Sequence, residues 1–529
     1  MTGKNAGDSL HGWMGLAIVM LLLGGVEALA QPPRSKIVFQ VVPGEQTGLQ
    51  AIMEKWKAEE LKRQGGKFGS HGWWPWGLVA FDYDNDGCLD LLLQHHGSPG
   101  SIIVRGLAKE KGKLSFVNVT EELGVGGAVL PGTARPHIWD IDGDGFLDIV
   151  GTDAKPNTCF FNKGGKKFEA MGFGFGQLTH LSPVLDLNGD GYPDVRSLRE
   201  GNQYFYDPKV RTFRKSAYVP PVLSRLPEAV TDLLKEAKEK NRFLEVNYLE
   251  DSDLNGDGRP DVVVSGFASY GGATFGRFLI ADAQGKLSDQ TAALGLPAEG
   301  TPILVMDLTG DGVADVLIAA SPQAGLYVND GKGKFTLQEG ELQKFLANRG
   351  SYLHKVLAVD FNRDGLADLV LSNPRLGLEA VFENLGGGKF ERVLEAKGWD
   401  ADPIALGDFN DDGLIDLAIG GPGDTVTIYL NQTAAPGNGC QLLLQMDKPN
   451  PFAAGARAEV FRAGELGQAG ARPIWVESAH ADGRPIFLGL GAAKQFDVRV
   501  VFPGKTVEQR GLEARGKWRI QPQGKAEGP

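Results

Sequence analysis

The amino-acid sequence predicts an all-β protein, a seven-bladed β-propeller followed by a small C-terminal β-domain. Three observations predict this fold: an aspartate-rich turn recurs seven times, β-type apolar runs flank the copies, and the turn stops well before the C-terminus. A repeat period of about fifty residues is typical of architectures that grow by repetition. The length of 529 residues suits such a fold, because a single ordinary core rarely grows so large.

The recurring turn is nine residues long, and its first copy reads "DYDNDGCLD". Positions 1, 5 and 9 are aspartate in every copy, position 6 is glycine, and position 3 is Asp, Asn or Thr. This agreement inside one chain indicates a shared local structure. Turns 1 to 7 begin, in chain order, at Asp82, Asp140, Asp186, Asp253, Asp307, Asp360 and Asp408.

The residues around each turn predict four antiparallel strands per repeat. Apolar runs precede and follow the turns, although the run after turn 3 is more polar, and a glycine-lysine turn such as "NKGGKKF" comes later in several repeats. Closing a ring of such sheets needs a strand from the far end of the chain, which removes exposed edges. We expect residues 36–42 to pair beside residues 426–432, and we expect helices over residues 48–64 and 227–243.

The first thirty residues resemble an export signal. An apolar stretch over residues 13–26 precedes the small residues of "ALA" at positions 28–30, and it is short for a bilayer span. The sequence therefore predicts a signal peptide over residues 1–30, a secreted or periplasmic protein, and no membrane span after cleavage. A net charge of −12 disfavours nucleic acid as a partner. Three cysteines make no disulfide framework, and a Cys88–Cys159 bridge stays open.

The aspartates of the turns predict a cation site in each copy. Oxygen ligands alone suit a hard cation, and Ca²⁺ fits best because it accepts many carboxylate and carbonyl oxygens. Zinc needs His or Cys, an EF-hand needs an acid at position 12 between helices, and a plain hairpin needs no carboxylates at fixed offsets. The predicted ligands are Asp82, Asp84, Asp86 and Asp90; Asp140, Asp142, Asp144 and Asp148; Asp186, Asn188, Asp190 and Asp194; Asp253, Asn255, Asp257 and Asp261; Asp307, Thr309, Asp311 and Asp315; Asp360, Asn362, Asp364 and Asp368; and Asp408, Asn410, Asp412 and Asp416.

These turns with β flanks resemble the FG-GAP/VCBS repeats of integrin-α-type propellers over residues 36–432. The Phe-Gly and Gly-Ala-Pro signatures are mostly absent, which favours the VCBS branch. After a linker over residues 433–439, "AAGARAEVF" and "IFLGLGAAKQFDVRVVFPGK" make residues 440–522 similar to the ASPIC/UnbV domain of cartilage acidic protein-like secreted proteins, with "FPGK" where Trp-Pro-x-Gly is usual. The resemblance implies a secreted calcium-binding propeller used for extracellular binding or adhesion, and no known reaction.

A ligand site is predicted on the face opposite the turns, at the mouth of the central channel. His180, His354 and Asp402 each stand six residues before a turn and would line that mouth, although solvated strand ends also tolerate polar residues. The sequence favours a binding protein whose partner is an extracellular protein or glycan, since it shows no nucleophile elbow, zinc motif or phosphate loop. Two alternatives stay open: a lyase-like carbohydrate-active enzyme using this mouth, and a structural component of a secreted complex.

Overall fold

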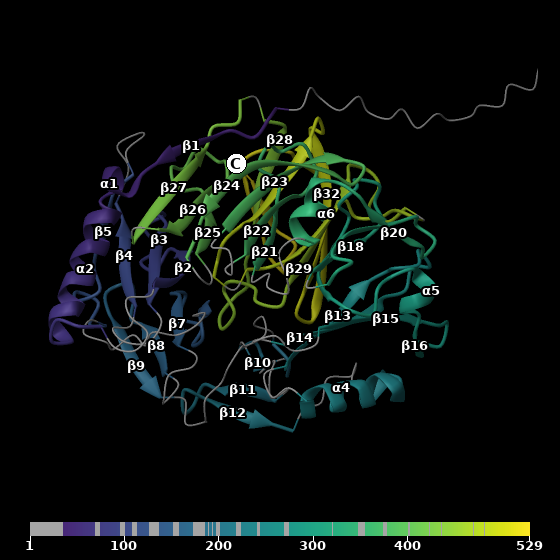
Figure 1. The fold of residues 1–529 in the computed structure, drawn as a ribbon, viewed down its shortest axis with the longest axis horizontal. Helices are drawn as coiled ribbons and strands as arrows, with labels where there is room; N and C mark the ends of the chain where they lie inside the picture. The colour runs from purple at the N-terminus through teal and green to yellow at the C-terminus, as the bar shows by residue number, and fades with distance from the viewer. Residues whose placement is uncertain are drawn as a thin grey trace, which may run out of the picture.

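Small, mostly antiparallel sheets make up the greater part of the chain (Figure 1). The computed structural model describes residues 35–68, 75–95, 101–107, 114–125, 137–151, 158–172, 186–188, 190–192, 194–196, 202–217, 224–240, 244–268, 274–319, 321–347, 355–373, 378–399, 403–422, 424–434, 436–468, 470–480 and 482–528. The helices are few and short. The predicted all-β class is confirmed.

Among the described residues, seven sheets, numbered here in chain order, precede the C-terminal region. Sheet 1 contains β2 (Pro75–Phe81), β3 (Asp90–His95), β4 (Ile102–Gly106) and β5 (Phe116–Asn118), and sheet 2 contains β6 (His137–Trp139), β7 (Asp148–Gly151), β8 (Thr158–Asn162) and β9 (Phe168–Gly172). Sheet 3 contains β10 (Val195–Arg196), β11 (Gln203–Asp207) and β12 (Thr212–Ser216), and sheet 4 contains β13 (Leu244–Ser252), β14 (Asp261–Ala268), β15 (Phe275–Ala281) and β16 (Leu287–Asp289).

The remaining three sheets follow the same plan. Sheet 5 contains β17 (Thr301–Met306), β18 (Asp315–Ala319), β19 (Gly325–Asn329) and β20 (Phe335–Gln338). Sheet 6 contains β21 (Lys355–Val359), β22 (Asp368–Asn373), β23 (Leu378–Gly386) and β24 (Lys389–Lys397). Sheet 7 contains β25 (Ile404–Gly407), β26 (Asp416–Gly421), β27 (Thr425–Asn431) and, as its outer strand, β1 (Phe39–Val42).

Sheet 7 joins the two ends of the repeated region, as the sequence predicted. β1 pairs antiparallel with β27, so that Phe39 lies opposite Asn431 and Val42 lies opposite Ile428. Ile37, just before β1, is buried against the core between sheets 6 and 7. The pairing brings the first and the last strand of the repeats into one sheet.

Apolar cores lie between neighbouring sheets and give the fold its propeller-like order. Buried residues of sheets 1 and 2, 2 and 3, 4 and 5, 5 and 6, 6 and 7, and 7 and 1 pack together. In Figure 1 the sheets follow one another around the molecule, from sheet 1 at the left through sheet 3 at the bottom to sheet 7 at the upper left. This β-propeller-like arrangement places every aspartate turn at the same end of its sheet.

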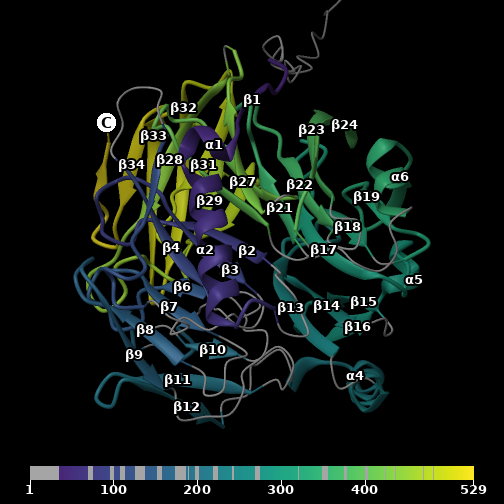
Figure 2. The same cartoon turned by 60° about the vertical axis from the view of Figure 1, so that its left-hand side comes forward.

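Two further sheets follow the repeats. One has the strand order β31 (Ile486–Gly491), β28 (Asn438–Leu444), β34 (Lys517–Ile520) and β35 (Ala526–Glu527). The other has the order β30 (Trp475–Ser478), β29 (Arg457–Arg462), β32 (Gln495–Phe502) and β33 (Lys505–Glu513). Their apolar residues form a core that continues into sheets 5 and 6, and Figure 2 shows these strands together on one side of the molecule.

The two predicted helices are confirmed as α2 (Leu49–Arg63) and α4 (Glu228–Lys240). α2 buries Met53 and Trp56 against the core between sheets 1 and 7, whereas α4 packs on sheet 4. Shorter helices are α1 (Gly44–Thr47), α5 (Thr291–Leu294) and α6 (Glu341–Ala347). Among the described residues, every helix is too short or too polar to cross a membrane. Cys88, Cys159 and Cys440 form no disulfide in the described part of the chain, so a Cys88–Cys159 bridge is absent there.

Because β1 completes sheet 7, we expect its removal to lower the free energy of unfolding substantially. A chain that begins at Pro43 loses the β1–β27 ladder and the buried side chain of Ile37, whose burial alone is worth about 3 kcal/mol. We expect its unfolding midpoint in denaturant to fall well below that of a chain beginning at Ser35. Equal midpoints would show that β1 contributes nothing to the stability of these sheets.

Candidate metal centres in the seven turns

Each aspartate turn ends where the second strand of its sheet begins. Position 9 is the first residue of β3, β7, β14, β18, β22 and β26, and it directly precedes β10 in sheet 3. All seven of these aspartates are completely buried. Strands precede the turns in six sheets, as predicted, while the stretch before turn 3 lies outside the described residues.

The carboxylate at position 1 closes the turn. Asp82 accepts hydrogen bonds from the backbone N–H groups of Asp86 (3.1 Å) and Gly87 (2.9 Å). The same two bonds, from positions 5 and 6, recur in all the other turns. Position 6 has a positive φ in every turn, as for Gly87 at 84°, which explains why only glycine occurs there.

The carboxylate at position 9 fastens the turn to the sheet. In turn 1, Asp90 accepts one bond from the backbone N–H of Tyr83 at position 2 (2.9 Å) and one from Gly106 on the third strand (2.9 Å). Both bonds have equivalents in each of the seven sheets. Position 5 likewise accepts the N–H of position 7, as Asp86 does from Cys88 (2.7 Å).

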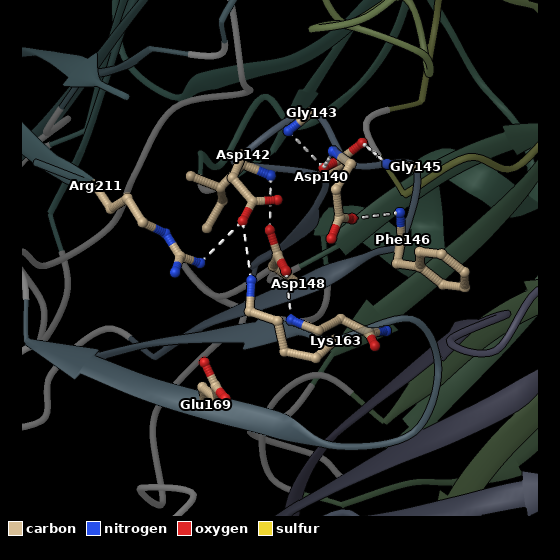
Figure 3. Close-up of polar contacts among 12 residues, drawn as sticks. Asp140, Asp142, Gly143, Gly145, Phe146, Asp148, Lys163, Glu169 and Arg211 are labelled. Carbon is tan, nitrogen blue, oxygen red and sulfur yellow. Dashed lines mark hydrogen bonds and ion pairs between the residues drawn. The ribbon is translucent and has the colours of Figure 1, made fainter. Parts of the chain in front are cut away.

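Turn 2 brings its carboxylates together most clearly (Figure 3). Oxygens of Asp140, Asp142 and Asp148 all lie within 4.8 Å of one another, and turn 1 forms a similar group with Asp82, Asp84 and Asp86. One oxygen of Asp142 pairs with Lys163 (3.2 Å) and Arg211 (2.9 Å). Its other oxygen is buried and has no hydrogen-bond partner among the described residues, so it remains available to a cation.

Burial sets the charge state of these carboxylates in the absence of a cation. Removal from water, opposed by hydrogen bonds from the backbone, raises the pKa of Asp90 and of Asp416 to about 8. The pKa of Asp140 rises to about 7, first through burial and then through the neighbouring Asp144 and Asp142. Crowded, buried carboxylates favour the protonated form unless a positive charge compensates them. The turns are therefore suited to a bound cation.

The donor set fits a hard cation, with differences between turns. By sequence, turns 1 and 2 carry four carboxylates each, of which three lie together, and turns 3, 4, 6 and 7 carry three and an asparagine. In turn 5, Thr309 replaces the acid or amide at position 3, and its hydroxyl lies 3.4 Å from Asp307. Oxygen-only donor sets of this kind suit a hard cation. Turn 5 is the poorest in ligands.

The C-terminal sheets cover the turns, which the sequence did not predict. Turn 6 receives backbone hydrogen bonds from Gly437 to Asn362 (2.9 Å) and from Gly491 to Arg363 (3.0 Å). Gly489 lies so close to Asp360 that a Cβ at position 489 would overlap the carboxylate.

Other turns also contact the C-terminal region. Lys448 donates to the carbonyl of Asp144 in turn 2 (2.7 Å), Arg472 donates to that of Gly312 in turn 5 (3.4 Å), and Lys517 pairs with Asp411 in turn 7 (3.3 Å). A cavity of about 170 Å³ lies between turns 1 and 7 and the cover, with Asp82, Asp408, Arg484 and Lys517 among its lining residues. The C-terminal region therefore contacts several turns, while position 5 stays exposed in turns 1, 3, 4, 5 and 7.

The predicted ligand residues of the channel mouth cannot be placed. His180, His354 and Asp402 lie outside the described residues, so the ligand site on the opposite face stays a prediction.

Comparison with known proteins identifies the repeats. Residues 140–197, 253–318 and 307–371, which contain turns 2 to 6, match the FG-GAP-like repeat family. The protein therefore carries FG-GAP-like repeats in a β-propeller-like fold. No curated protein sequence matches the chain.

The matches among solved structures are distant. A lectin from Agrocybe aegerita that recognises non-reducing terminal N-acetylglucosamine is 18% identical, with a TM-score of 0.37 over 68% of this chain and 86% of the lectin. A rhamnogalacturonan lyase from Bacillus licheniformis is 13% identical, with a TM-score of 0.27 over 69% of this chain and 72% of the lyase. The Tc holotoxin pore of Photorhabdus luminescens is 14% identical, with a TM-score of 0.30 over 76% of this chain and 23% of that one.

The raised pKa values predict how chelated protein responds to pH. In the folded, cation-free protein the carboxyl groups of Asp90, Asp140 and Asp416 bind protons more tightly than in the unfolded chain, where the pKa is about 3.9. Their contribution to stability is therefore full below about pH 4 and is lost as the pH rises through 7 to 8. With chelator present, we expect the denaturant midpoint to fall between pH 6 and pH 8.5, roughly.

Saturating calcium is the control for this pH series, because a bound cation favours the ionised carboxylates and should flatten the decline. A chelated protein that becomes more stable across the same pH range would contradict the assignment.

The packing of Gly489 on turn 6 predicts a second measurable effect. Gly489→Ala forces a methyl group against the buried carboxylate of Asp360, and we expect the free energy of unfolding to fall by about 2–3 kcal/mol. Gly340→Ala is the matched control, since a Cβ there meets open space, and its cost should stay below about 1 kcal/mol. Equal effects of the two substitutions would mean that Gly489 does not pack tightly against Asp360 of turn 6.

Proposed function

We propose that the protein is an exported, calcium-binding FG-GAP/VCBS repeat protein that binds an extracellular protein or glycan, with sheets 1 to 7 as the blades of a seven-bladed propeller. One observation supports the calcium sites above all others. All seven turns hold their carboxylates in the same hydrogen-bonded frame, with positions 1, 5 and 9 fixed by backbone N–H groups. A frame repeated this faithfully, with the carboxylate at position 9 buried in every turn, favours a counter-charge.

The calcium would be held by the side chains at positions 1, 3, 5 and 9 and the carbonyl of position 7. Bound Ca²⁺ supplies a fixed double positive charge among the carboxylates. The residues of this chain do the rest: position 9 ties the turn to two strands, and glycine at position 6 bends the chain back onto position 1. Because these residues reach their arrangement only in the folded chain, calcium binding would stabilise the propeller.

The C-terminal region serves in this proposal as an ASPIC/UnbV-like domain over residues 440–522. Its two sheets lie against the turns through contacts with turns 2, 5, 6 and 7. A ligand would then bind elsewhere, at the opposite face of the propeller, where His180, His354 and Asp402 are proposed contacts. FG-GAP-like repeats are typical of extracellular proteins, which supports the proposed signal peptide over residues 1–30 and an extracellular location.

The test is thermal unfolding of the chain from residue 31 onward, with calcium, with magnesium and with chelator, beside metal analysis of the same sample. Each site saturated at a hundred times its Kd adds about 2.7 kcal/mol, so we expect calcium to raise the Tm strongly and magnesium to raise it little. Asp144→Asn should weaken the response, because it removes one carboxylate from turn 2. A metal-free protein with the same Tm in calcium and in chelator would contradict the proposal.

A further inference from the structure

Four buried asparagines connect one turn to the next across the boundary between sheets. Each lies at or near the end of the third strand of its sheet and donates its side-chain N–H to the backbone carbonyl at position 2 of the preceding turn. These bonds run from Asn162 to Tyr83 (2.8 Å), from Asn329 to Leu254 (2.9 Å), from Asn384 to Leu308 (2.9 Å) and from Asn431 to Phe361 (2.9 Å). All four side chains are buried.

The same asparagines hold the position-9 aspartate of their own sheet. The backbone N–H of Asn384 donates to Asp368 (2.8 Å), and Leu308, which receives its side chain, donates its own N–H to Asp315 (2.9 Å). A continuous path therefore runs from Asp315 in turn 5 through Leu308 and Asn384 to Asp368 in turn 6. Asn162, Asn329 and Asn431 complete equivalent paths.

Three boundaries lack this connection because another residue stands at the equivalent place. Gly106, Tyr206 and Ala281 donate their backbone N–H to Asp90, Asp194 and Asp261, but none of them has a side-chain amide. The asparagines therefore join turns 4, 5, 6 and 7 in one series and turns 1 and 2 in another. Turn 3 has no such link to either neighbour.

We propose that these asparagines are positioning residues that couple calcium binding between neighbouring turns. The inference rests on the proposed function, because it concerns the order in which calcium sites fill. Turns 4 to 7 bind calcium as one cooperative group, turns 1 and 2 as another, and turn 3 binds independently. Turn 5, the poorest in ligands, has an asparagine link on both sides and gains most from its neighbours.

The physical reason lies in the double use of position 9. Its carboxylate is a proposed calcium ligand and also accepts the N–H groups of position 2 and of the third strand, so an ion that fixes the carboxylate fixes both backbone segments. The asparagine transmits that constraint, since releasing its buried bonds leaves polar groups unpaired and is costly. Fixing one turn therefore lowers the cost of ordering the next, which is the definition of coupling between sites.

The experiment removes one calcium site at a time and observes the others. Asp311→Asn weakens turn 5 without touching an asparagine link, and Asp190→Asn does the same to turn 3. Backbone hydrogen exchange is then followed in each turn against calcium concentration. In Asp311→Asn we expect the calcium needed to protect turns 4 and 6 to rise about fivefold or more, whereas Asp190→Asn leaves turns 2 and 4 unchanged.

A second variant tests the link itself. Asn384→Ala combined with Asp311→Asn should abolish the effect on turn 6 and keep the effect on turn 4, which Asn329 still joins to turn 5. Asn450→Ala is the matched control, because that buried amide bonds to Ala454 inside the C-terminal region and joins no turns. The control should lower stability without changing which turns respond together.

The outcomes separate this inference from the proposed function. Calcium that binds, with effects confined to the altered turn or spreading equally from turn 3 and turn 5, overturns the coupling alone. A wild-type chain without calcium in metal analysis, and without calcium-dependent protection in any turn, overturns both. Because the Asp311→Asn and Asp190→Asn comparison keeps every asparagine, it decides the question even if Asn384→Ala fails to fold.

Discussion

Seven completely buried aspartates at the start of the second strands are the constraint on which the rest of the structure depends. Each carboxylate accepts hydrogen bonds from its own turn and from the third strand, and so fixes where three chain segments meet. Burial of so much negative charge is costly, and the pKa of Asp90 near 8 reflects that cost. This burial is made possible by the backbone N–H donors, by the glycine at position 6 and by the other oxygen ligands of the turn.

The turns share a frame without being equal, and their surroundings explain the differences. In turn 2, Lys163 and Arg211 lie over the ring of Phe161 and pair with Asp142, so part of its charge is compensated by the protein itself. Turn 6 is enclosed by the C-terminal region, whose glycines approach Asp360 and Arg363 closely. A single repeated motif thus yields sites that differ in charge and in access to solvent.

The sequence could predict whatever depends on local pattern. The position of six turns between strands and the helices α2 and α4 followed from spacing and hydrophobic runs, and the pairing of β1 with β27 followed from the expectation that the repeats close into a ring. It could not predict the cover over the turns, because "TAAPGNG" indicates a linker and says nothing of where the following sheets dock.

The asparagine links were also beyond sequence reasoning, since Asn162 and Asn384 look like ordinary residues of a strand end until the neighbouring sheet is in place. Such contacts join segments far apart in the chain, where periodicity carries no information.

The pairing of β1 with β27 has a consequence for biosynthesis. Strand β1 is made long before its partner β27, which follows almost four hundred residues later in the chain. Closing so long a loop is slow and entropically costly. Sheets 1 to 6 can assemble in the meantime, but the nascent chain keeps an unpaired strand edge that invites aggregation. Shielding of residues 36–42 until β27 has been made would therefore limit aggregation of the nascent chain.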